Sequence, residues 1–379
     1  MSDETPTPVG PMVSEPPGPP GPASAARPDT ALTAPPAVAA PPLRLAFAEL
    51  GLGLAGLAAL GLGMIEVALY FVLATLLLAA HAADVHPALR RVHAWLGWIP
   101  AVVGAVLLGA VAFSTTRGVA LAGDVPRLAI AGFALLGAGV TLALLSRRLA
   151  DACARGLFRG ATPDRTLRLA ATLVVTTLWL GPSLWFVAHD VLAEFLADPS
   201  RLTSPVSLTG SLVGYVVLAF AGVGWLARRD LAAALDRLGL VRPRARDLLA
   251  AVVGVLVLWL FNAGSEWLER ATLPELWRRD SAFGIALAGT LGPAQVLLLG
   301  LSAGVGEEIT LRGALQPKLG IVLTAVLFAV LHVQYSWYGI LSLMFFGLLL
   351  GLVRRHGNTT AAILVHAVYD VIAVATAGH

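Results

Sequence analysis

Charged residues are scarce in this chain. Only 13% of its 379 residues are charged, whereas about one quarter of the residues in an ordinary soluble domain are. In their place 57% of the residues are hydrophobic, and the mean hydropathy is +0.80. This composition argues strongly against a soluble globular protein. Long apolar runs recur from residue 45 to the C-terminus, so we expect an all-α fold, namely a polytopic transmembrane helical bundle of about ten or eleven spans.

Lysine and cysteine are almost absent. Lys318 is the only lysine among 26 basic residues, and the net charge is +3. Because no basic run is interleaved with aromatic residues, we assign no nucleic-acid partner. Cys153 is the single cysteine, which excludes an intrachain disulfide and a metal site built from several thiolates.

The first 43 residues differ in composition from the rest. They hold 13 of the 24 prolines, placed among Ala, Ser and Thr. Such a segment cannot bury enough apolar surface to offset the entropy of ordering it, so we predict that residues 1–43 form a disordered tail. The tail lacks the basic stretch and the apolar core of a signal peptide. We divide the remainder into an N-terminal transmembrane region, residues 44–239, and a C-terminal region, residues 240–379.

Apolar length and helix breakers predict eleven spans, with Gly61, Gly63 and Glu66 favouring a turn between the first two. The spans are 45–63, 66–83, 96–114, 128–146, 168–188, 208–227, 247–266, 284–304, 319–334, 337–353 and 359–376. Most arginines between spans fall on one side of the predicted membrane. By the positive-inside rule this side is cytoplasmic, which makes the chain a multi-pass protein of the cell membrane that contacts the lipid bilayer.

Polar residues occur in or beside the last spans, where lipid does not tolerate them unless they face a protein interior or a water cavity. They are Glu307, Glu308, Arg312, His332, His366 and Asp370. Glu308 and Arg312 are four residues apart, so they can pair on a helix. Glu307 points about 100° away from Glu308 and has no such partner. His366 and Asp370 are also four apart and share a helix face.

An unpaired carboxylate in a low-dielectric cavity is a stronger base than in water, so Glu307 can take a proton from a water molecule. A nearby histidine can relay that proton or hold a metal. A second histidine beside a carboxylate can stabilise an oxyanion or complete a metal shell with two histidines and a carboxylate. A structural interpretation stands beside this one, because ion pairs and single histidines inside membranes often only join helices.

Three motifs, "GEEITLRG", "LFAVLH" and "LVHAVYD", resemble those of the CPBP family of intramembrane metalloproteases. This is the CAAX-protease and bacteriocin-processing family, also called Abi, and the match is of the type II CAAX prenyl endopeptidase kind. The family pattern is a Glu pair with an Arg four residues after the second Glu, then Phe-x-x-x-His, then His-x-x-x-Asn or Asp. Order and spacing agree over residues 240 to 376, which we therefore assign to an intramembrane protease domain extending to residue 379.

The resemblance implies a peptidase whose active site lies inside the membrane and opens toward the cytoplasm. It implies that Glu307 and His332 activate the attacking water, and that His366 and Asp370 stabilise the oxyanion. Glu308 and Arg312 then support the first helix. Two mechanisms stay open: a divalent metal such as zinc held by Glu307, His332 and His366, or a metal-free Glu mechanism. No HExxH sequence occurs here.

Two positions depart from the family pattern. Leu311 stands where Phe is common, which is a packing change. Asp370 stands where the family also uses Asn. An ionised Asp370 would repel an oxyanion, so it must be protonated or bind a cation, and the second option favours a metal.

Three functions are compatible with these residues. The first is an intramembrane endopeptidase that hydrolyses a membrane-associated peptide or protein substrate of the prenylated or bacteriocin type. The second is a non-catalytic immunity or scaffold protein that retains the motifs as a polar core. The third is a proton-coupled transporter with Glu307, His332 and His366 as a relay, which the complete set of motifs disfavours, as does the absence of inverted repeats with broken helices.

Overall fold

The computed structural model describes residues 40–94, 96–118, 121, 125–158, 161–187, 196–198 and 203–377. Most of the predicted tail, residues 1–39, lies outside these ranges. Its last residues do not continue a tail, because Pro42 and Leu43 begin the first helix. Pro42 suits this place, since the first helical residue has no intrahelical use for its N–H.

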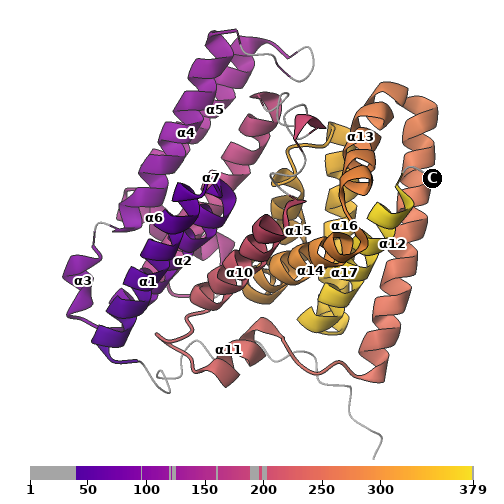
Figure 1. Ribbon diagram of the computed structural model, residues 1–379. Helices are drawn as coiled ribbons and strands as arrows, with labels where there is room; N and C mark the ends of the chain where they lie inside the picture. The colour runs from indigo at the N-terminus through magenta and orange to yellow at the C-terminus, as the bar shows by residue number, and fades with distance from the viewer. Residues whose placement is uncertain are drawn as a thin grey trace, which may run out of the picture. The chain divides into compact units, whose positions relative to one another are not determined.

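Within the described residues the chain is all-α, as predicted, and contains no strand (Figure 1). The N-terminal elements are α1 (Pro42–Gly61), α2 (Ile65–Val85), α3 (Leu89–Val92), the 3₁₀ turn η2 (Leu96–Trp98), α4 (Ile99–Thr116), α5 (Arg127–Ala143), α6 (Arg147–Leu157), α7 (Arg165–Val187) and α10 (Pro205–Gly222). The C-terminal elements are α11 (Leu231–Leu238), α12 (Ala245–Thr272), α13 (Pro274–Thr290), α14 (Pro293–Glu308), the π-helix η3 (Ile309–Leu315), α15 (Gln316–Val330), α16 (Trp337–His356) and α17 (Thr359–Thr376).

Nine helical stretches of the described chain are long and apolar enough to cross a membrane. A tenth arises if α5 and α6, which are bent by 104° at their junction, form one broken span. The polytopic helical bundle is therefore confirmed, with a span count at or just below the predicted one. The predicted turn between the first two spans is also confirmed, because α1 ends at Gly61 and Gly63 takes a φ of 74° in the left-handed region.

The predicted spans 284–304 and 319–334 are wrong. Helix α13 ends at Thr290, and α14 begins at Pro293 after an N-cap at Gly292. From Pro293 the helical backbone runs through η3 into α15, so the segment predicted as a loop between two spans is helical. The break comes later, at Gly320, whose φ of 80° and ψ of 171° favour glycine.

The π-helix η3 is explained by Pro317, which has no N–H to donate to the preceding turn. Side chains supply the missing donors. Arg354 Nε donates to the carbonyl of Arg312 at 3.0 Å. Arg237 donates to the carbonyls of Gly313 at 3.0 Å and of Ala314 at 3.2 Å. Two arginines from α11 and α16 thus hold the irregular turn that follows the two glutamates.

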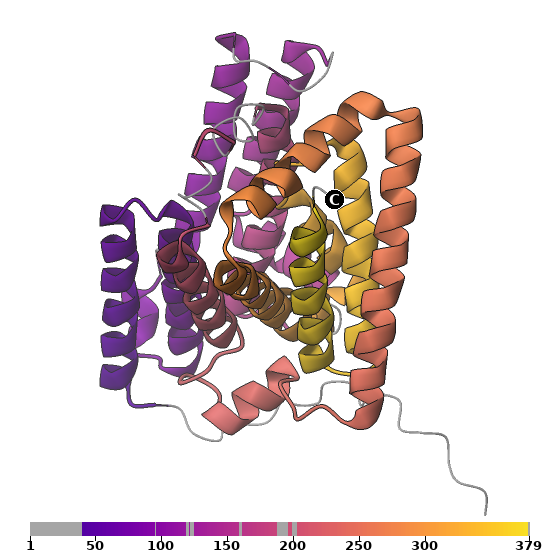
Figure 2. The same cartoon turned by 45° about the vertical axis from the view of Figure 1, so that its right-hand side comes forward.

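Small residues bring the helices around this turn into close contact. A Cβ added to Gly304 of α14 would lie 2.7 Å from the backbone nitrogen of Ala367 in α17. A Cβ on Gly347 of α16 would lie 3.0 Å from Ala325 Cα in α15. Helix α10 lies between α2 and α14, an arrangement visible in both views (Figure 1 and Figure 2). The N-terminal helices therefore reach the helix that carries the glutamate pair.

Candidate active site

Glu308 and Arg312 form a fully buried ion pair. Arg312 Nη1 donates to Glu308 Oε1 at 2.9 Å, and both side chains are completely shielded. Arg312 also donates from Nη2 to the carbonyl of Gly347 at 3.2 Å, which ties η3 to α16. The pairing expected from the four-residue spacing is present, although the backbone between the two residues is a π-helix rather than an α-helix.

His366 joins this pair from α17. Its Nδ1 donates to Glu308 Oε1 at 2.9 Å, so one carboxylate oxygen accepts from both Arg312 and His366. On the other side of the ring, Nε2 lies 3.4 Å from Asp370 Oδ2. His366 and Asp370 share a face of α17, as their spacing predicts. The contact between His366 and Glu308 was not predicted, because sequence spacing says nothing about two separate helices.

Phe328 is the packing centre of the three motifs. Its side chain is 1% exposed, and its ring lies 4.8 Å below the guanidinium of Arg312. The same ring is 4.7 Å from the ring of His332 and 5.9 Å from that of His366. Phe346 of α16 covers His366 from a further side at 5.0 Å. The aromatic residue of the second motif thus fixes the positions of both histidines and of the arginine.

His332 lies in the segment between α15 and α16. Its Nδ1 donates to the carbonyl of Phe328 at 2.8 Å, which leaves Nε2 as the nitrogen with the free lone pair. Desolvation in this enclosed position lowers the pKa of His332 and keeps the ring neutral. A neutral imidazole with a free Nε2 can accept a proton or a hydrogen bond from a bound molecule.

Two neighbouring helices hold the segment that carries His332. Trp185 of α7 donates from Nε1 to the carbonyl of Tyr335 at 2.9 Å. Asp280 of α13 accepts from the backbone N–H of Ser336 at 2.7 Å and from its hydroxyl at 2.6 Å. Asp280 therefore anchors the start of α16 and, with Trp185, limits the movement of His332.

Glu307 is placed differently from Glu308. It is partly buried and hydrogen-bonds to none of the described residues. It nevertheless lies close enough to His366, Arg312 and Glu66 for their charges to act on it. The charges of His366 and Asp370 in turn act on His332. The structure thus brings all the predicted site residues into one cluster between α14, η3, α17 and the segment after α15, while their catalytic roles stay predictions.

The predicted metal ligands are not arranged as a metal site. In the described part of the chain, no group of three His, Cys, Asp or Glu side chains is placed to hold a common ion. Nδ1 of His366 donates to Glu308, and Nε2, the ring nitrogen that a metal could use, lies 3.4 Å from Asp370 Oδ2. The Oε2 atom of Glu308 lacks a hydrogen-bond partner among the described residues, but one oxygen atom alone does not make a metal site. The metal option for Glu307, His332 and His366 stays a prediction, because their donor atoms suit a zinc ion but are not placed around a common point.

Sequence reasoning missed several residues around the cluster. Tyr215 of α10 lies directly against Gly306, the residue before Glu307. Tyr70 of α2 contacts Tyr215, and its hydroxyl donates to Glu66. The four-residue spacing of Glu66 and Tyr70 was a usable signal, since such pairs meet on a helix. No local signal marked Asp280, whose partner is far along the chain.

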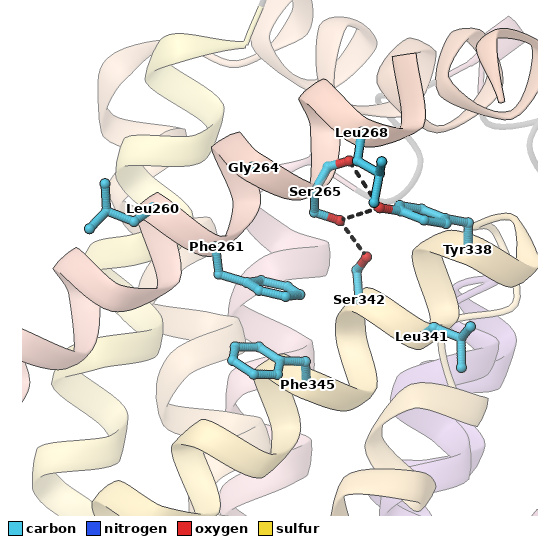
Figure 3. Close-up of a pocket in the computed structure, with 9 residues that line it drawn as sticks. All are labelled: Leu260, Phe261, Gly264, Ser265, Leu268, Tyr338, Leu341, Ser342 and Phe345. Carbon is cyan, nitrogen blue, oxygen red and sulfur yellow. Dashed lines mark hydrogen bonds between the residues drawn. The ribbon is translucent and has the colours of Figure 1, made fainter. Parts of the chain in front are cut away.

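A groove of about 530 Å³ lies between α12 and α16 (Figure 3). Phe261 and Phe345 stack across it with ring centroids 3.9 Å apart. Of its polar side chains, Ser265 hydrogen-bonds to both Ser342 and Tyr338. None of the nine lining residues is a predicted site residue, and none is a carboxylate or a histidine.

Comparison with known proteins gives one finding. Residues 289–372 match the family model described as type II CAAX prenyl endopeptidase Rce1-like. The matched segment contains all six predicted site residues, and it confirms the resemblance inferred from the motifs. No curated protein and no solved structure matches the chain. The match supports an intramembrane endopeptidase in general terms, and the apolar helices identify an integral membrane protein.

Proposed function

We propose that this chain is an intramembrane endopeptidase that hydrolyses a peptide bond in a membrane-associated substrate of the prenylated or bacteriocin type. The distribution of arginines supports a location in the cell membrane, with the active site opening toward the cytoplasm. Residues 240–379 form the catalytic region in this proposal, and residues 289–372 carry the family match.

One observation carries the proposal, namely the different surroundings of the two adjacent glutamates. Glu308 is held by Arg312 and His366 and is occupied in the scaffold. Glu307 has no hydrogen-bond partner among the described residues, and the charge of His366 acts on it. An acid left free in a cluster that holds two imidazoles is suited to general base catalysis.

The proposed reaction uses only side chains of this chain. Glu307 takes a proton from a water molecule that His332 Nε2 holds by a hydrogen bond. The water oxygen forms a bond to the peptide carbonyl carbon, and the carbonyl oxygen becomes an oxyanion. The carbon–nitrogen bond then breaks, and the leaving amine takes the proton back from Glu307. Atoms and protons balance without a further reactant.

His366 is suited to the developing negative charge. Carboxylates face both ring nitrogens, and in this proposal the ring carries a proton on each of them. The 3.4 Å separation from Asp370 is too long for a strong hydrogen bond, so the Nε2–H group is free to donate to an oxyanion. Asp370 then offsets the charge of the imidazolium and does not itself contact the oxyanion.

A second candidate is the non-catalytic immunity or scaffold protein. The completely buried Glu308–Arg312 pair favours it, because the bonds of the pair to His366 and to the Gly347 carbonyl join three helices whether or not catalysis occurs. Glu307 separates the two candidates, since a polar scaffold has no need of an acid without a partner.

Cleavage in ¹⁸O-labelled water tests the proposal. Full-length protein in proteoliposomes is incubated with membrane-anchored peptides, and the products are analysed by mass spectrometry. The wild type should place one labelled oxygen in the new carboxyl group, whereas Glu307→Gln and His332→Ala should yield no product. Persistent cleavage in both variants, or no cleavage of any anchored peptide by the wild type, would favour the scaffold instead.

A further inference from the structure

Helix α6 turns sharply away from α5 and carries its charge on one face. It begins after Ser146 and is bent by 104° from α5, so it runs across the direction of that helix. Its charged residues fall within an arc of about 100° on the helix surface. They are Arg147, Arg148, Asp151 and Arg155. An amphipathic helix turned across the direction of a membrane-crossing segment is typical of one that lies in the plane of the membrane surface.

The apolar face of α6 packs against the rest of the protein. Ala150 and Ala154 are buried in this contact. Ala154 forms a core cluster with Phe158, the residue after the helix, and with Ala171 of α7. Leu319 of α15 packs against the same cluster and belongs to the region that the family model matches. Because α6 is fixed to both α7 and α15, its charged face has a defined position.

The one acid of this face is neutralised from within the protein. Arg168 of α7 donates from Nη1 to Asp151 Oδ1 at 2.9 Å. Arg147, Arg148 and Arg155 are exposed and form no ion pair with any of the described residues. We call these three residues the α6 arginines. Among the described residues, nothing balances the three positive charges that they place on one side of a fixed helix.

The stability of α6 itself does not account for the α6 arginines. Two of them, Arg147 and Arg148, occupy the first turn, where the positive end of the helix dipole disfavours cations. The next residue, Leu149, is 50% exposed although it is large and apolar. At a membrane surface such a side chain enters the region where the acyl chains begin, while basic side chains reach the head groups. The combination matches one ligand, a lipid whose phosphate group carries a net negative charge.

We propose that the α6 arginines bind the phosphate groups of anionic phospholipids in the leaflet on the arginine-rich side of the membrane, while Leu149 contacts the acyl chains. Guanidinium groups suit this task because they donate two parallel hydrogen bonds to a phosphate and stay charged at any physiological pH. An acidic protein segment would balance the charges but would leave Leu149 without an apolar partner. The bound lipid holds α6 at the membrane surface, and through Leu319 it supports the start of α15. This role is separate from the proposed peptidase reaction.

Native mass spectrometry of the full chain tests this proposal. The protein is released from mixed micelles with equal amounts of anionic phosphatidylglycerol and zwitterionic phosphatidylcholine, and the retained lipids are counted. The wild type should prefer phosphatidylglycerol. One basic residue near an anionic surface strengthens binding about fivefold, so a variant with Arg147→Gln, Arg148→Gln and Arg155→Gln should lose at least about tenfold of this preference. Lysine at the same three positions keeps the charge and should retain most of the preference.

A matched variant removes three exposed arginines from separate elements on the same side of the membrane. It carries Arg44→Gln in α1, Arg242→Gln before α12 and Arg355→Gln in α16. It has the same net charge as the α6 variant but should keep the wild-type preference. The proposal is overturned if the wild type retains both lipids equally, if the α6 variant keeps the preference, or if both variants lose it to the same extent. Lipid retention needs no substrate, so this result and that of the peptidase assay are separate.

Discussion

Replacing Arg312 by methionine should strongly destabilise the protein, because it leaves the buried carboxylate of Glu308 without its cation. Arg312 makes one charged hydrogen bond to Glu308, one hydrogen bond to the Gly347 carbonyl and one cation–π contact with Phe328. Removing one partner of a buried ion pair costs about 3–5 kcal/mol. His366 still donates to Glu308, so we expect a value near the lower end, about 3 kcal/mol.

A double-mutant cycle isolates the part of this cost that belongs to the pair. Glu308→Gln removes the charge that Arg312 compensates, so the double variant should be more stable than the sum of the single changes predicts. We expect a coupling energy of about 2 kcal/mol or more. The exposed pair of Arg278 and Glu275 is the matched control, with side chains 61% and 80% accessible. Its coupling should be about 0.5 kcal/mol or less.

Unfolding in mixed detergent micelles measures these energies, with the fluorescence of the nine tryptophans as the signal. A cost of less than about 1 kcal/mol for Arg312→Met, a value typical of a surface pair, would show that the buried pair does not stabilise the fold as expected. Additive single costs at Glu308 and Arg312 would show the same, because two groups in contact at 2.9 Å in a dry interior must be coupled.

Three further changes test the surroundings of the site. Phe328→Leu should lower the free energy of unfolding by about 1–2 kcal/mol and should lower the cleavage rate more than stability alone explains, because both histidines lose their packing surface. Gly304→Ala should push α14 away from Ala367 and reduce cleavage at a cost of about 1–3 kcal/mol, whereas Gly289→Ala, which has open space, should do neither. Burial raises the pKa of Asp280, so its contribution to stability is fully present below its ordinary pKa, about 4, and is lost as the pH rises through the raised value. Melting temperatures measured across this range should show a fall for the wild type that Asp280→Asn lacks.

Helical spacing predicted the parts of the site that lie on one stretch of chain. Glu308 and Arg312 meet because residues four apart are neighbours on a helix, and His366 and Asp370 share a face for the same reason. The turn after Gly61 was predictable because glycine takes the left-handed backbone that a tight reversal needs. Local geometry is enough for features of this kind.

Contacts between distant segments were not predictable in this way. The span predicted for residues 284–304 overlooked Pro293, which starts a new helix although the segment is apolar throughout. The π-helix after Glu308 depends on Arg237 and Arg354, whose side chains replace donors missing from the backbone. The contact of Glu308 with His366 and the position of Tyr215 depend on helix packing. That packing is set by small residues, and the sequence does not indicate which helix each of them contacts.

Two adjacent glutamates have different tasks in the proposed reaction, and the single-turnover cleavage rate of Glu307→Gln tests this most directly. The variant should match the melting temperature of the wild type, because Glu307 bonds to none of the described residues. Its rate should fall by about 10²- to 10⁴-fold, the usual contribution of a general base. Glu275→Gln, the same change at an exposed acid, should retain the wild-type rate. Cleavage by a folded Glu307→Gln variant at the wild-type rate would contradict the account.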